Sequence, residues 1–278
     1  MPKYRIGHTA LTWDVFAHPE NIADAVRDCA ELGYAGTETG GRLYDWWLKE
    51  RPGQLQKTLK EYDVKMACLF QFGTWTELGE RESLVADGRR WADELVKIGG
   101  EVLMVVPGGK RAEPAYTPEE FQIMADTMNE VGRQALKVGL KCAMHPHWGT
   151  VAETREEIEL LLSLLDPSIV GFAPDSGQIA KGGSDPVPMF EKYKDRIQHV
   201  HLKDLSPEWE EMKRAGVPLR SPEGYAEVGQ GVVDFPAIFD IVKSIDFDGW
   251  LMAELDETKR TAHESAVLSR EYLKRYVG

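Results

Sequence analysis

The sequence is poor in basic residues. Its 278 residues include 33 Lys and Arg against 46 Asp and Glu, so the formal net charge at pH 7 is −13. Surfaces that bind nucleic acids are normally basic, and we therefore expect no nucleic-acid partner. A small neutral or anionic substrate remains compatible with this charge, because a local positive group or a metal ion can hold it.

Long apolar runs and a disulfide framework are also missing. No run approaches the roughly 20 apolar residues that span a bilayer, and residues 1–10 lack the apolar segment of a signal peptide. The three cysteines, Cys29, Cys68 and Cys142, are odd in number and widely spaced, as expected of free thiols in a reducing compartment. We expect a cytoplasmic protein with no membrane partner.

What the sequence does contain is a repeated strand signal. Eight short β-prone runs recur along the chain, and no linker or change of composition separates them, which favours a single domain over residues 1–278. These runs are Tyr4–His8, Tyr34–Glu38, Val64–Phe70, Val102–Val106, Leu140–Met144, Ile169–Ala173, Ile197–Leu202 and Trp250–Ala253.

Helical patterns lie between these runs. Thr117-Pro118-Glu119-Glu120, for example, combines an N-cap residue, a first-turn proline and two acidic residues. The alternation predicts a parallel sheet, and eight repeats predict a closed (β/α)8 TIM barrel. An open Rossmann-like sheet is the alternative, but no Gly-rich dinucleotide loop follows the first strand. The other helical segments are Ala23–Leu32, Arg81–Ile98, Thr154–Leu165, Phe235–Ile245 and Thr258–Tyr276.

Two connections exceed the ordinary loop length. They are Gly40–Gly53 after the second strand and Leu205–Gly231 after the seventh strand. Both belong to the C-terminal face, where barrel enzymes have their sites, and could form lids that exclude water. Packing or homo-oligomer contacts are the alternative use of such loops.

Three strand ends carry side chains suited to a metal ion. Asp175 follows the sixth strand, His201 lies at the end of the seventh and Glu254 follows the eighth. The carboxyl ends of barrel strands share one face, so these side chains should converge. Alternation places His199, His201 and Lys203 on one face of the seventh strand. A turn-forming Asp and a core histidine are the alternatives.

The fifth strand leads into His145-Pro146-His147, and Glu153 lies a few residues further. Either histidine could be a metal ligand or a general base, and Glu153 could reach back as a carboxylate ligand. Glu153 could equally stabilise the start of the next helix. Oxygen-rich sites with one or two imidazoles suit divalent ions, and we expect Mn²⁺ first, with Mg²⁺, Co²⁺ and Zn²⁺ as alternatives.

Three further residues are candidates for substrate contact. Glu38 ends the second strand and could bind a sugar hydroxyl or a positive side chain, or cap a turn. Trp13 could form a wall against the apolar face of a sugar, although aromatic residues near strand ends more often belong to the core. Arg220 could hold a phosphate, as could Lys110-Arg111.

Four stretches of the chain carry a family resemblance: HPHWGTVAET, DSGQIAKGGSDP, HVHLKD, and VGQGVVDF followed by DFDGWLMAE. They resemble motifs of the xylose-isomerase-like barrel superfamily of sugar-phosphate isomerases and epimerases, above all its inosose dehydratase group. The resemblance covers nearly the whole chain and implies a metal ion held by Asp175, His201 and Glu254.

The chain also departs from the family pattern at two positions. The family usually adds a Glu from the end of the fifth strand, and here Glu153 or a histidine of His145-Pro146-His147 would replace it. Gln178 stands where the family commonly has a histidine. An amide can bond a substrate hydroxyl but cannot carry a proton.

The resemblance implies an enzyme that removes a proton next to the carbonyl of a keto-sugar or keto-cyclitol, with the ion as Lewis acid. A dehydratase needs a second group to protonate the departing hydroxyl, and His145, His147 and Lys203 are the candidates for acid and base. The alternative is a sugar or sugar-phosphate isomerase or epimerase, in which Glu153 and Glu254 would move the proton. The two extra histidines favour the dehydratase.

Overall fold

Eight parallel strands form the barrel that the sequence predicts. The structure is a computed structural model that describes residues 3–109, 116–216 and 222–276. Each strand overlaps one of the eight predicted runs, although β6 and β7 are shorter than predicted. The strands are β1 (Arg5–Thr9), β2 (Gly36–Gly40), β3 (Lys65–Gly73), β4 (Val102–Pro107), β5 (Lys141–Met144), β6 (Gly171–Phe172), β7 (Val200–Leu202) and β10 (Trp250–Ala253).

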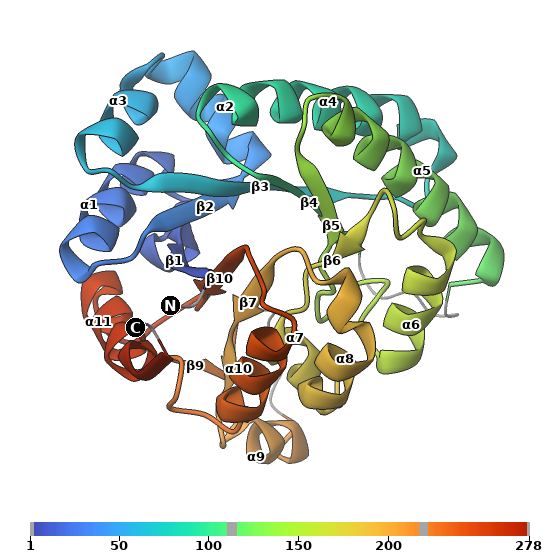
Figure 1. Ribbon diagram of the computed structural model, residues 1–278. Coiled ribbons are helices and arrows are strands. Elements are labelled where there is room, and N and C mark those ends of the chain that lie inside the picture. The colour runs from blue at the N-terminus through green and yellow to red at the C-terminus, as the bar shows by residue number, and fades with distance from the viewer. Residues whose placement is uncertain (1–2, 110–115, 217–221, 277–278) are drawn as a thin grey trace.

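The strands neighbour one another around the ring in the order β6-β5-β4-β3-β2-β1-β10-β7. In Figure 1 the first strand of the chain, β1, lies beside the last, β10, and the two pair in parallel. Two isolated parallel bridges, Phe172 to Ile197 and Asp175 to His201, join the ends of the sheet at β6 and β7. The barrel is therefore closed, and one of its closing bridges consists of two predicted metal ligands.

Alternation along the strands divides the core into two parts. Trp250 and Met252 belong to a cluster that also contains Phe70, whereas Leu251 packs in the larger cluster that includes the helices. Glycine makes room for the bulky residues, because a Cβ on Gly36 would lie 2.7 Å from the Trp250 ring.

Helices surround the ring of strands (Figure 1). The predicted start of the helix after Thr117 is confirmed, since Thr117 and Glu120 form a reciprocal capping box. Within the described residues, no helix is both long and apolar enough to cross a bilayer. The main helices are α1 (Ile22–Leu32), α2 (Gly41–Glu50), α3 (Gln54–Glu61), α4 (Arg81–Lys97), α5 (Pro118–Lys137), α6 (Arg155–Leu164), α7 (Ser176–Lys181), α8 (Pro186–Tyr193), α10 (Phe235–Ser244) and α11 (Ala262–Leu273).

The two predicted long loops contain regular structure. Most of Gly40–Gly53 is helix α2, because Tyr44 and Trp47 recur at helical spacing and are buried. Leu205–Gly231 contains α9 (Trp209–Arg214) and β9 (Tyr225–Ala226), which pairs in antiparallel fashion with β8 (Asp204–Leu205). The prediction that both segments are loops is therefore wrong, because each contains a helix, whereas their role as lids stays a prediction.

Asp204 fixes the return of the chain after β9. Its carboxylate accepts four backbone hydrogen bonds: from Leu205, Gly229 and Val233 at 3.0 Å and from Gly231 at 2.8 Å. A carboxylate has enough lone pairs for four donors, whereas an amide offers only one oxygen. Asp204 therefore positions the segment that follows the β8–β9 pair.

We predict that Asp204→Asn lowers the free energy of unfolding by about 2 kcal/mol, because the amide leaves buried backbone donors without an acceptor. Urea denaturation followed by circular dichroism measures this change. Asp240→Asn on the exposed side of α10 is the matched control and should change stability by less than about 0.5 kcal/mol. Equal stabilities of the two variants would contradict this role of Asp204.

Candidate metal centre and active-site mouth

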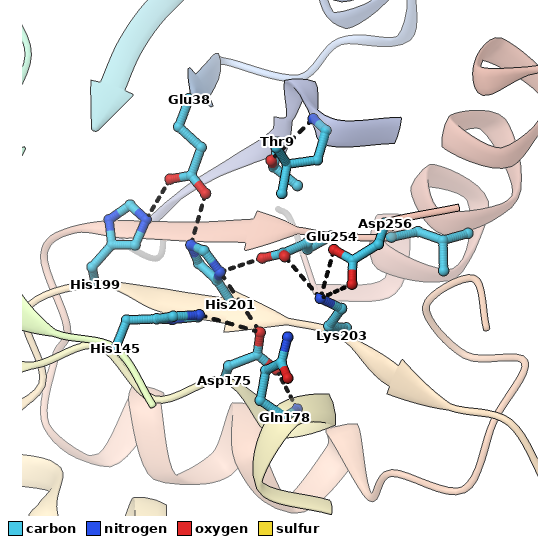
Figure 2. A network of polar contacts seen from close by, with 12 residues as sticks. Thr9, Glu38, His145, Asp175, Gln178, His199, His201, Lys203, Glu254 and Asp256 are labelled. Atoms are coloured by element: carbon cyan, nitrogen blue, oxygen red, sulfur yellow. Dashed lines mark hydrogen bonds and ion pairs between the residues drawn. The ribbon is translucent and has the colours of Figure 1, made fainter. Parts of the chain in front are cut away.

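Four ligand-type side chains converge at the carboxyl ends of four strands (Figure 2). His145 follows β5, Asp175 follows β6, His201 lies in β7 and Glu254 follows β10. All four are buried, with 0–3% of each residue exposed. The predicted convergence of Asp175, His201 and Glu254 is thus what the structure shows, and His145 joins them from the fifth strand.

The polar atoms of this cluster face one another. Nδ1 of His201 lies 3.7 Å from Oδ2 of Asp175 and in short contact with Oε2 of Glu254. Nε2 of His145 lies 3.9 Å from the same Asp175 oxygen. His145, Asp175 and His201 each offer one ligand atom, and these atoms all lie within 4.8 Å of one another.

The chemistry of these atoms fits a divalent cation. Oδ2 of Asp175, Oε2 of Glu254 and Nδ1 of His201 are buried, and none has a well-formed hydrogen bond among the described residues. Buried polar atoms without partners are costly, and a cation would satisfy all three. Two imidazoles with two carboxylates suit Mn²⁺, Co²⁺ or Zn²⁺.

A second layer beneath the cluster orients His201. Oε1 of Glu38 lies 2.7 Å from Nε2 of His201, and Oε2 of Glu38 lies 2.8 Å from Nε2 of His199. Burial alone would lower the pKa of His201, but Glu38, Glu254 and Asp175 outweigh it and raise the pKa. A cation at Nδ1 would displace the proton there, while Glu38 holds the proton on Nε2. Burial by itself would raise the pKa of Glu38, but His201 and His199 outweigh it and lower the pKa to about 2.

Glu38, His199 and His201 could also be regarded as a metal-binding group, since their ligand atoms lie within 4.8 Å of one another. Oε2 of Glu38 already has a hydrogen bond to His199, and the upper cluster brings together two carboxylates and two imidazoles, so the upper cluster is the better cation site. Of the two partners expected for Glu38, a sugar hydroxyl or a positive side chain, the structure provides the second.

Lys203 is an ion-pair partner within the site. Its Nζ lies 2.9 Å from Oε1 of Glu254 and 2.9 Å from both oxygens of Asp256, and the residue is fully buried. Burial alone would lower the pKa of Lys203, but Asp256, Glu254 and Asp175 outweigh it and raise the pKa. Lys203 thus lies as the counter-ion of two carboxylates, and its role as acid or base stays a prediction.

A cavity of about 800 Å³ opens at the mouth of the barrel, and His147 and Asp256 line it. Nδ1 of His147 lies 2.8 Å from the carbonyl oxygen of Trp148, which can only accept, so Nε2 carries the lone pair. Burial, followed by the charge of Lys203, lowers the pKa of His147 and keeps the ring neutral. Burial also raises the pKa of Asp256, against the opposing effect of Lys203.

Asp256 was not predicted from the sequence. A signal for it exists, because Glu254 and Asp256 are two residues apart and an extended chain places such residues on one side. The two carboxylates share the Lys203 ammonium in Figure 2.

Other predicted residues lie elsewhere. Glu153 accepts a hydrogen bond from the backbone N–H of Gly149 at 2.8 Å and belongs to none of the ligand groups found among the described residues. Trp13 is 6% exposed, and its indole donates to Asp28 at 2.8 Å, so its ring belongs to the core. Arg220 and Lys110-Arg111 lie outside the described residues.

Gln178 supports the cation site from below. Its backbone N–H donates to Asp175 at 2.7 Å, and its side-chain oxygen accepts from the Trp148 backbone at 2.9 Å and from the Tyr225 hydroxyl at 2.6 Å. Its buried Nε2 has no protein partner among the described residues. This Nε2 is therefore available to donate the hydrogen bond that the sequence predicts from Gln178 to a substrate hydroxyl.

Known proteins resemble this chain over nearly its whole length. The family model described as "Xylose isomerase-like TIM barrel" matches residues 26–276. The chain belongs to this family. Family members similar to it include the inosose dehydratase of Geobacillus kaustophilus, 30% identical over 99% of this chain and 95% of that protein. The inosose dehydratase of Clostridium beijerinckii is 28% identical over 99% and 98%.

Solved structures share the same fold. An IOLI protein with a bound zinc atom matches with a TM-score of 0.78 at 18% identity and covers 98% of both chains. The probable 3-DHS dehydratase AsbF from Bacillus anthracis matches with a TM-score of 0.77 at 16% identity, over 97% of this chain and 98% of that one. The motifs thus predicted the family and the barrel correctly.

We predict that Glu38→Gln weakens Mn²⁺ binding about 10- to 100-fold, the usual effect of removing the carboxylate that orients a metal-bound histidine. Isothermal titration calorimetry of metal-free protein measures the affinity. Glu101→Gln removes a carboxylate that pairs with Arg5 at the opposite end of the barrel and should leave the affinity unchanged. An unchanged affinity in Glu38→Gln would show that His201 needs no orienting partner.

Proposed function

We propose that this protein is a divalent-metal-dependent dehydratase that removes a proton next to the carbonyl of a keto-sugar or keto-cyclitol and expels a hydroxyl as water. The observation that carries the proposal is the convergence of His145, Asp175, His201 and Glu254 beside a cavity that His147 and Asp256 line. The family membership and the inosose dehydratase relatives support an enzyme that modifies sugars or cyclitols, as a dehydratase or an isomerase.

The four converging side chains would hold the ion. When bound, the ion would act as a Lewis acid that polarises the substrate carbonyl and makes the neighbouring C–H more acidic. Glu38 would keep His201 in the required tautomer, and Lys203 would balance the charge of Glu254 and Asp256.

His147 is the proposed general base. Its ring is neutral, and its Nε2 carries a lone pair at a cavity wall, so it can accept the proton from the α-carbon. The proposed acid is the Lys203–Asp256 pair, because Asp256 lines the same cavity and both of its oxygens accept hydrogen bonds from the Lys203 ammonium, which can supply the proton. Breaking the β C–O bond with transfer of that proton releases water and leaves an enone.

Two proton-carrying groups at one cavity favour dehydration. An isomerase or epimerase can return the same proton through one base, whereas a dehydratase must also protonate its leaving group. Glu153, expected to serve an isomerase together with Glu254, instead bonds the Gly149 backbone.

We predict that Mn²⁺-loaded protein converts an inosose to a product that has lost one water and absorbs in the ultraviolet. Chelation of the metal should abolish the reaction, and added Mn²⁺ should restore it. Mass spectrometry and absorbance measure the product. A product of unchanged mass would identify an isomerase or epimerase instead, and full turnover without metal would refute the proposal.

His147→Gln should lower kcat about 10²- to 10⁴-fold, the usual effect of losing a general base, while Mn²⁺ affinity stays within about twofold. The matched control is His18→Gln, since His18 is exposed on a connecting turn and should keep full activity. Normal kcat in His147→Gln would exclude this residue as the base.

The fifth-strand ligand can be tested separately with a matched pair. We predict that His145→Gln weakens Mn²⁺ binding by at least about 10-fold, because it removes an imidazole from the cluster, whereas Glu153→Gln does not. Calorimetric titration of both variants measures the difference. The reverse order of affinities would restore Glu153 as the ligand.

A further inference from the structure

A second cavity adjoins the mouth of the barrel. It measures about 390 Å³, and it shares Phe16 and Phe72 with the cavity that contains His147 and Asp256. The two phenylalanines therefore stand in a common wall between the reacting centre and additional space. Neither residue is needed for the cation site or for the proposed proton transfer.

The second cavity lies over the ends of three neighbouring strands. Gly40 ends β2, Gly73 ends β3 and Gly108 follows β4, so its floor is largely backbone. These glycines cannot be replaced freely, because a Cβ on Gly108 would lie 2.4 Å from the Gly73 carbonyl oxygen. A backbone floor without side chains leaves room for a flat ring.

The walls of this cavity are mostly apolar. Leu43 and Phe70 contribute to them together with the two shared phenylalanines, and Arg42 is the one charged side chain among the described residues that line it. The site of the proposed chemistry, by contrast, is dense in carboxylates and imidazoles. These walls suit the apolar face of a neutral ring.

The phenylalanine rings are unusually accessible for their position. Phe16 is 64% exposed and Phe72 is 42% exposed, although both stand beside a buried polar site. The Phe72 ring lies 5.9 Å from the ring of His147 and 5.7 Å from that of Phe70. Exposed aromatic faces at a cavity are suited to stacking against a sugar or an aryl ring.

We propose that the second cavity is a subsite for a neutral, ring-shaped substituent on the substrate, so that the enzyme takes a glycoside rather than a free monosaccharide. The proposal rests on the proposed function, since the reacting ring would occupy the mouth cavity. The substituent would contact Phe16 and Phe72, and the ring of Phe72 lies 5.9 Å from that of His147. An aryl aglycone and a second sugar ring share the required chemistry.

Binding of unreactive ligands tests this subsite without turnover. Methyl β-D-glucoside, phenyl β-D-glucoside and cellobiose share one ring, lack a ketone and differ in their substituent. In calorimetric titration of Mn²⁺-loaded protein, the phenyl glucoside or cellobiose should bind about tenfold more tightly than the methyl glucoside. Preference for the phenyl ligand would identify an aryl subsite, and preference for cellobiose a sugar subsite.

Two variants check that the preference arises in this cavity. Phe16→Ala removes a shared wall, and Thr74→Trp fills the cavity from an exposed position. Each should bring the affinities for the three ligands to within about twofold. Leu78→Ala changes another exposed apolar residue, 63% accessible and outside both linings, and should retain the preference.

Equal affinities for the three ligands in the unaltered protein, or a preference that survives Thr74→Trp, would overturn the subsite. A failed dehydration assay combined with a retained preference would instead count against the proposed reaction and leave the subsite intact. The two failures are therefore distinguishable.

Discussion

The upper end of this barrel depends on the pairing of charges around His201. One edge of its ring meets Glu38, and the other meets Asp175 and Glu254. Burial would make any of these carboxylates unfavourable as an isolated charge, and the imidazole between them makes the cluster tolerable. The strands must therefore hold the ring in one orientation, which is also the orientation that a metal-binding histidine needs.

Lys203 likewise balances the charge of buried carboxylates. It joins Glu254 to Asp256, so that three ionisable groups occupy a buried space with one positive charge between two negative ones. Its ammonium also lies 4.3 Å from the centre of the Tyr225 ring, which belongs to the β8–β9 pair. The same lysine thereby connects the charged site to the segment that covers it.

The barrel could be predicted from the sequence, because strand runs and helix caps are local signals. Asp175, His201 and Glu254 were also predictable, since strand ends converge in any such barrel. The choice between His145 and Glu153 was not, because it depends on how the chain turns after β5. Asp256 was missed, because neither a strand nor a motif marks it.

Glu38 and helix α2 also depend on contacts with residues far away in the sequence, which the sequence alone does not show. The sequence places Glu38 at a strand end but cannot show that its partners come from β7, since that contact spans 161 residues. In α2, the length of the Gly40–Gly53 connection suggested a lid, whereas the helical spacing of Tyr44 and Trp47 serves burial against the barrel.

The closure of the barrel between β6 and β7 affects how stable the closed barrel is. Between β3 and β4 six residue pairs are in register, whereas β6 and β7 meet only through two isolated bridges, one of them between Asp175 and His201. An ion held by these two side chains would link β7 to the segment that follows β6, where isolated bridges close the barrel. Binding of a cation there would then stabilise the closed barrel against local opening, in addition to any part that the ion takes in the proposed reaction.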